Sequence, residues 1–204
     1  MPQFRSFATA VSASLSTPIR RVPSIHIGLG SASQLGVVAA DLLQQAQRVF
    51  VVTDPGVRAA GLLEGCTTNL QENNYDVQVF DNVVADPPDH LIAKAVDSAR
   101  SFGANCIVGL GGGSAMDTAK LVAALLGNGS TQTLEQMYGV GNVTGSRLPL
   151  IQIPTTAGTG SEVTPVSIVT AGHSKMGGTF VFPIAFSSLS LSLTFFFLSF
   201  FLSG

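Results

Sequence analysis

The sequence predicts an α/β fold with a doubly wound, mostly parallel, Rossmann-like sheet. Short apolar runs alternate along the chain with segments whose apolar residues recur at helical spacing. Turns rich in glycine and proline separate the two kinds of segment, and three polar loops directly follow strands. Such alternation builds strand–helix–strand units, which place helices on the faces of a parallel sheet.

The first elements are predicted between residues 25 and 80. The apolar runs predict strands, and a helix is expected wherever apolar residues recur at helical spacing after a capping residue or a turn. The expected order is a strand at Ile25–Ile27, a helix capped by Ser31 and extending to about Gln47, a strand at Arg48–Thr53, a helix after Asp54 that bears Val57, Leu62 and Leu63, and a strand at Asp76–Phe80.

The remaining elements continue the same alternation. The expected order is a helix after Asp89, a strand at Cys106–Val108 that enters a block of glycines, a helix near Ser114, a strand at Leu148–Ile153 and a strand at Val166–Thr170. A segment rich in loop residues separates the helix after Ser114 from the strand that begins at Leu148.

The glycine block comprises Gly109 and Gly111–Gly113, and a helical pattern follows it. Glycine lets backbone N–H groups approach a phosphate, and the amino end of a helix adds partial positive charge. Ser114 is placed to act as the N-cap or as a donor in the first turn. The spacing matches neither a Rossmann fingerprint nor a P-loop, so a tight turn without a ligand is the alternative. Lys120 is expected at the helix surface or in a salt bridge.

Three loops are predicted at the carboxyl edge of the sheet, where ligands of such folds bind. They are Thr53–Asp54, Gly111–Ser114 and the hydroxyl-rich loop Thr155–Ser161. One carboxylate, one glycine turn and several hydroxyls suit a ribose, a pyrophosphate and the polar groups of a ring. The three loops predict a dinucleotide site, although a mononucleotide or a sugar phosphate would fit nearly as well.

Charge and cysteine content argue against nucleic-acid binding and against a metal site built from cysteines. Charged residues make up 11% of the chain, whereas soluble domains average about 25%. The net charge of −2 gives no basic field for nucleic acid. Cys66 and Cys106 lie far apart in sequence and match no metal-binding spacing.

Two motifs closely resemble the iron-containing (group III) alcohol dehydrogenases. They are Gly111-Gly-Gly-Ser-x-x-Asp-x-x-Lys120 and Ile153-Pro-Thr-Thr-Ala-Gly-Thr-Gly-Ser-Glu-Val-Thr164. The similarity extends from about Val22 to Met176. It implies a domain that binds NAD, or alternatively NADP, followed by an all-helical domain in which one Asp and three His hold Fe²⁺ or Zn²⁺. It also implies hydride transfer between the nicotinamide and a primary or secondary alcohol or carbonyl, whose oxygen the metal polarises.

The resemblance assigns cofactor-binding roles by position in this sequence. Asp54 would bind the ribose hydroxyls of the adenosine, which favours NAD because a 2′-phosphate would be repelled. Gly112, Gly113 and Ser114 would bind the pyrophosphate, and Asp117 would lie near the nicotinamide. The other implied cofactor residues are Asp86, Thr155, Thr156, Gly158, Thr159, Ser161 and Lys175. No catalytic residue is identified, and His26, His90 and His173 match no metal position.

Related enzymes leave the reaction partly open. Glycerol dehydrogenases and hydroxyacid–oxoacid transhydrogenases share the implied architecture, although the loop at Thr155–Glu162 favours the alcohol dehydrogenases. The expected partners are a dinucleotide and a small alcohol or aldehyde, and members of the family often form homo-oligomers. A membrane-tethered nucleotide-binding module is the alternative that is not an enzyme.

The two ends of the chain differ in composition from residues 22–178, which form the expected dinucleotide-binding domain. Residues 1–21 contain many Ser, Ala and Thr and no acidic residue, which is typical of a mitochondrial transit peptide; a disordered terminus and a cytoplasmic protein are the alternative.

Residues 179–204 are almost entirely Phe, Leu and Ser. Such a tail is compatible with a membrane anchor, a buried segment of a larger core or the translation of pyrimidine-rich non-coding sequence such as a retained intron. On each of these interpretations the family's helical domain and its metal ligands are absent, and the chain alone is expected not to catalyse.

Overall fold

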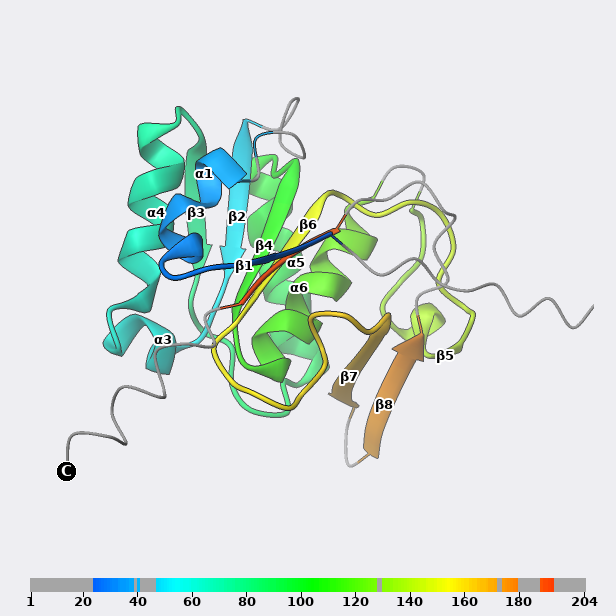
Figure 1. The fold of residues 1–204 in the computed structure, drawn as a ribbon. Coiled ribbons are helices and arrows are strands. Elements are labelled where there is room, and N and C mark those ends of the chain that lie inside the picture. The colour runs from blue at the N-terminus through cyan, green and yellow to red at the C-terminus, as the bar shows by residue number, and fades with distance from the viewer. Residues whose placement is uncertain are drawn as a thin grey trace, which may run out of the picture.

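The computed structural model describes residues 24–38, 40, 47–127, 130–171, 174–179 and 188–192 (Figure 1). The transit-like segment predicted at 1–21 and most of the tail predicted at 179–204 lie outside these residues. In the part of the chain that is described, no helix is long and apolar enough to cross a membrane.

Six strands of the described chain form one parallel sheet in the order β1-β9-β6-β4-β2-β3. Their bounds are β1 Ser24–Ile27, β2 Arg48–Val52, β3 Asp76–Phe80, β4 Cys106–Gly111, β6 Leu150–Pro154 and β9 Ser188–Ser192. The doubly wound, Rossmann-like α/β fold predicted from the sequence is therefore confirmed. Figure 1 shows β1 and β9, which are far apart in sequence, lying side by side.

Helices cover both faces of this sheet. Their bounds are η1 Ser31–Gln34, α1 Leu35–Val38, α3 Pro55–Ala59, α4 Leu62–Glu72, α5 Asp89–Phe102, α6 Gly113–Leu125 and η2 Glu135–Met137. Alternate residues of β2 supply the two cores, since side chains of a strand point to opposite faces in turn. Phe50 and Val52 pack with α5 and α6, whereas Val49 and Val51 pack with η1, α1, α3 and α4.

Two of the predicted helices begin or end at residues other than those expected. The helix expected after Asp54 is interrupted at Gly61, whose φ of 69° ends α3 and begins α4. The helix expected from Ser31 begins as the 3-10 turn η1, for which Gly30 occupies the N-cap and no side chain caps. Ser31 is thus the first residue of η1, and the capping role predicted for it is wrong.

Strand β4 is longer than the sequence suggests, because it includes Gly109 and Gly111. A Cβ atom on Gly109 would lie 2.3 Å from the Gln152 side-chain oxygen and 2.9 Å from the Ala119 Cβ. The glycine at this position therefore lets α6 and β6 approach β4 closely. The glycine block is therefore divided among three places: Gly109 and Gly111 belong to β4, Gly112 forms the turn, and Gly113 begins α6.

A second sheet of the described residues has the order β5-β8-β7. Its strands are β5 Gly139–Val140, β7 Val166–Ala171 and β8 Ser174–Thr179, and β7 pairs with β8 antiparallel. Helix α6 contacts β7 as well as β4 and β6. The helix that follows the glycine turn therefore connects the two sheets.

Candidate functional site

A pocket of about 630 Å³ lies at the carboxyl edge of the parallel sheet. The carboxyl ends of β2, β4 and β6 and the loop after β3 all contribute to its lining. Six residues that the sequence predicts to bind a cofactor meet in it: Asp54, Gly112, Gly113, Ser114, Thr155 and Thr156. The structure thus brings the three predicted loops together around one space.

Asp54 is fixed in this pocket by the helix that follows it. It is the N-cap of α3, and its Oδ1 accepts a hydrogen bond of 3.0 Å from the Val57 backbone N–H. Its other carboxylate oxygen faces the end of β4, since a Cβ atom on Gly111 would lie 2.9 Å from it. The cap therefore holds one negative charge between the end of β2 and the glycine turn.

Adjacent glycines in the turn serve different purposes. Gly111 has a φ of 151°, and a Cβ atom there would also lie 2.9 Å from the Ala115 Cβ. A Cβ atom on Gly112 or Gly113 would instead lie 3.4 or 3.5 Å from a threonine side chain, which is ordinary van der Waals distance. Gly111 is therefore required by the fold, whereas Gly112 and Gly113 leave the amino end of α6 open to the pocket.

Ser114 lies in the first turn of α6, after Gly113. The N-cap position is occupied by Gly112, and no side chain caps the helix. Of the two roles predicted for Ser114, the first-turn position is confirmed and the N-cap position is wrong. The first N–H groups of an α-helix have no partner within the helix, so this end of α6 suits an anion.

The hydroxyl-rich loop is attached to the glycine turn at its start. The Thr155 backbone N–H donates to the Gly111 carbonyl at 2.9 Å. Thr156, Gly158 and Thr159 are exposed, and Thr159 lies beside Gly113. The loop therefore forms the wall of the pocket that faces the amino end of α6.

Asp117 and Ser161 do not line the pocket. They form a largely buried polar network with Lys120. The Lys120 Nζ donates to the Asp117 Oδ1 at 3.0 Å, to the Ser161 Oγ at 2.8 Å and to the Val166 carbonyl at 2.6 Å. The Ser161 hydroxyl also donates to the Asp117 carboxylate. The salt-bridge role expected for Lys120 is confirmed, and the surface position expected as its alternative is wrong.

Burial lowers the pKa of Lys120 below its usual value of 10.5, and the nearby carboxylates of Asp117 and Glu162 oppose this shift. The Lys120 and Asp117 side chains are 7% and 13% exposed, respectively. A buried charge costs free energy unless it is paired and hydrogen-bonded. The three acceptors around the ammonium group offset that cost.

The two remaining predicted residues lie at other points of the fold. Asp86 follows β3 in a left-handed backbone conformation, with a φ of 49°, directly after the pocket residues Val83, Val84 and Ala85. Lys175 lies in β8, opposite Thr170 of β7. Its side chain is outside the described part of the structure.

Sequence reasoning missed the apolar wall of the pocket. It is formed by Val57, Ala60, Leu62, Val83, Val84 and Ala85. Val84 is 49% exposed, so its side chain is open to contact with the flat face of a ring. Apolar residues after β3 were a signal in the sequence, but only the fold places them opposite Asp54.

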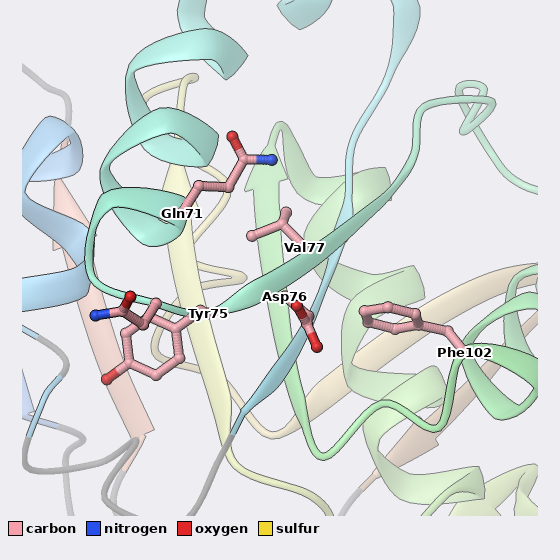
Figure 2. Close-up of a pocket in the computed structure, with 6 residues that line it drawn as sticks. Gln71, Tyr75, Asp76, Val77 and Phe102 are labelled. Atoms are coloured by element: carbon pink, nitrogen blue, oxygen red, sulfur yellow. The ribbon is translucent and has the colours of Figure 1, made fainter.

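A second hollow, of about 580 Å³, lies at the opposite edge of the sheet, near the start of β3 (Figure 2). Gln71 of α4, Tyr75, Val77 of β3 and Phe102 of α5 line it. None of the predicted site residues lies there, and no helix begins at it. Among the described residues, no group of three His, Cys, Asp or Glu side chains could hold a metal ion.

Comparison with known proteins gives a consistent family assignment. The family model for iron-containing alcohol dehydrogenase matches residues 23–189. Long-chain-alcohol dehydrogenase 1 of Geobacillus thermodenitrificans is 38% identical over 154 residues, which are 75% of this chain and 38% of that protein. The NAD-dependent methanol dehydrogenase of Bacillus methanolicus is 32% identical over 154 residues, 76% of this chain and 39% of that protein.

Solved structures agree with the sequence relatives. A 1,3-propanediol oxidoreductase aligns with a TM-score of 0.74 and 27% identity, covering 85% of this chain and 44% of that chain. An iron-containing alcohol dehydrogenase from Thermotoga maritima aligns with a TM-score of 0.71 and 35% identity, covering 85% and 47%. The chain therefore spans about two fifths of the length of these curated relatives and under half of these solved chains.

Proposed function

The chain belongs to the iron-containing alcohol dehydrogenase family, and from this premise we propose that it forms the dinucleotide-binding part of an NAD-dependent alcohol dehydrogenase. One observation carries the proposal: a carboxylate, the open amino end of a helix and two threonine hydroxyls line the same pocket. The name of the methanol dehydrogenase relative, which specifies NAD, supports the choice of cofactor.

Each wall of the pocket suits a different part of the dinucleotide. The open backbone N–H groups of Gly113 and Ser114 suit the pyrophosphate, because they point from a helix amino end without partners in the helix. The Asp54 carboxylate suits the two hydroxyls of a ribose and would repel a 2′-phosphate. The valines after β3 suit the adenine. When bound, the nicotinamide supplies the acceptor or donor of a hydride.

Titration calorimetry with NAD⁺, NADP⁺ and AMP tests this proposal. We expect NAD⁺ to bind at least about tenfold more tightly than NADP⁺, a difference of about 1.4 kcal/mol. The matched control is Asp54→Asn, since asparagine also caps helices well and keeps the fold while removing the charge. That variant should bind the two dinucleotides more equally. Absence of NAD⁺ binding at millimolar concentration, by protein with a folded circular dichroism spectrum, would refute the proposal.

The metal of the family has no site among the described residues, so we assign none of these residues to it. The sequence-based expectation that this chain alone does not turn over alcohols remains a prediction. It is tested by incubating the chain with Fe²⁺ or Zn²⁺, NAD⁺ and a panel of short primary and secondary alcohols. An NADH-forming activity that copurifies with the protein would show the expectation to be wrong.

A further inference from the structure

The second turn of α6 makes contacts that a ligand-binding role does not explain. Asp117 accepts hydrogen bonds from Lys120, from the Ser161 hydroxyl and, at 3.0 Å through Oδ2, from the Ile168 backbone N–H. The Ser167 hydroxyl donates to the Asp117 carbonyl at 3.1 Å. Each of these partners belongs to the chain itself.

These contacts join three segments that are distant in sequence. Lys120 and Asp117 belong to α6, Ser161 ends the hydroxyl-rich loop, and Ile168 lies in β7. We use the name latch for the set Asp117, Lys120 and Ser161 with their mutual hydrogen bonds. The latch fastens both the loop and the β7–β8 hairpin to the helix that begins at the glycine turn.

The latch completes the attachment of the hydroxyl-rich loop. Its start is held where the Thr155 N–H bonds to the Gly111 carbonyl, and its end is held where Ser161 bonds to Lys120. The residues between these points are mostly exposed. Without the second attachment, the loop would be bonded to the glycine turn at its start and otherwise only to itself, as where the Ser161 N–H donates to the Thr159 hydroxyl.

We propose that Lys120 is a positioning residue for dinucleotide binding, which acts with Asp117 to hold the hydroxyl-rich loop opposite the glycine turn. This inference rests on the proposed function, because it assigns the loop to the dinucleotide pocket. It gives Asp117 and Ser161 a role in the protein framework in place of direct contact with the cofactor. A loop held in advance binds more tightly, because less conformational entropy is lost on binding.

The variant Lys120→Met tests the proposal, with Lys94→Met as its matched control, because Lys94 is exposed on α5. Backbone hydrogen exchange of the ligand-free protein is the first measurement. We expect Lys120→Met to accelerate exchange across residues 155–168, including the Ile168 amide, at least about tenfold more than in β2 and α5, whose exchange follows the global stability. Lys94→Met should leave exchange in all of these segments unchanged.

Dissociation constants for NAD⁺ and AMP are the second measurement. We expect Lys120→Met to weaken NAD⁺ binding at least about tenfold and AMP binding less than about threefold, since the adenosine end contacts Asp54 rather than the loop. Where Lys120→Met does not fold, Ser161→Ala decides, because it removes the hydroxyl that joins the end of the loop to Lys120 and Asp117. That variant should accelerate exchange in the same residues by a smaller factor.

Two results would overturn the proposal. The first is unchanged exchange across residues 155–168 in the folded variant. The second is a parallel loss of NAD⁺ and AMP affinity, which would indicate a general effect on the fold. If the unaltered protein binds no NAD⁺, the proposed function fails while the exchange measurement still tests the latch.

Discussion

The first and second turns of helix α6 are adjacent and have opposite properties. In the first turn, Gly113 and Ser114 face a pocket, and the helix has no side-chain cap. In the second turn, Lys120 is buried and Asp117 is 13% exposed, and both are bonded to other segments of the chain. The contrast indicates that one motif contains both a surface for a ligand and the support that keeps this surface in place.

The largest expected effect comes from the second turn. Lys120→Met leaves the Asp117 carboxylate buried without its cation, and we expect the free energy of unfolding to fall by about 3–5 kcal/mol. Chemical denaturation measures this change. The double variant Asp117→Asn/Lys120→Met should recover much of the loss, because it removes both charges together. The stability losses of Asp117→Asn and Lys120→Met, each measured alone, complete the comparison. If the loss in the double variant equals their sum, the two charges do not interact, and the contrast drawn between the two turns is wrong.

A smaller loss of stability is expected just before the first turn. Gly111→Ala places a Cβ atom 2.9 Å from the Ala115 Cβ and on a residue with a φ of 151°. Crowding and backbone strain together should lower the free energy of unfolding by about 1–3 kcal/mol. Thermal and denaturant unfolding check this value. An unchanged unfolding midpoint would mean that the end of β4 adjusts freely.

The neighbouring glycine should behave differently. Gly112→Ala adds a Cβ atom at 3.4 Å from the Thr156 side chain, which causes no crowding. We therefore expect only the cost of alanine at the N-cap of α6, a fall of about 0.5–1 kcal/mol in the free energy of unfolding. The added methyl group occupies space in the pocket, and NAD⁺ affinity should fall about tenfold, or about 1.4 kcal/mol. NAD⁺ affinity from calorimetry and unfolding curves, recorded for each of the single variants Gly112→Ala and Gly111→Ala, separate the effect on binding from the effect on stability. Equal stability losses in the two variants would remove the distinction between them.

The smallest expected effect is a dependence of stability on pH. Because burial lowers the folded-state pKa of Lys120 below 10.5, the unfolded chain binds more protons between the two values. The contribution of Lys120 to stability should therefore rise with pH across that window. Burial raises the pKa of Cys66 to about 11 and of Cys106 to about 12, so their contribution falls as pH rises above 9.

The cysteine effect is shared by the protein and its Lys120→Met variant, so the difference between their stabilities isolates the lysine. Unfolding curves recorded from pH 7 to pH 10.5 should show the stability of the unaltered protein rising relative to the variant. A constant difference would indicate that Lys120 titrates at its ordinary pKa. In that case the second turn would be better solvated than its burial implies.

Local patterns predicted most of the fold. The apolar runs at Arg48–Thr53 and Cys106–Val108 and the helical periodicity after Asp89 depend on neighbours in sequence, so the chain alone indicates them. The interruption at Gly61 was missed, because a glycine within a helical pattern does not reveal its φ. The 3-10 turn after Gly30 was missed for a similar reason, since Ser31 fits an N-cap equally well in sequence.

The candidate site was predicted less completely. Asp54, Gly112 and Thr155 follow strands directly, and parallel pairing brings such positions to one edge. A salt bridge of Lys120 was predicted, but the attachment of Asp117 and Lys120 to other segments was not, because those partners lie 44 and 46 residues away at Ser161 and Val166. Sequence spacing indicates that two residues share a helix face but does not indicate what packs against it.

The position of β9 has a consequence for the order of folding. Among the described strands, β1 joins the parallel sheet through β9, which separates it from β6. During synthesis, Ser24–Ile27 therefore leaves the ribosome before Ser188–Ser192, with which it pairs among the described strands. Pairing across so long a separation closes a large loop and is entropically slow. The strand bearing Ile25 and Ile27 is therefore an unpaired edge until that pairing forms, and such edges are prone to aggregation.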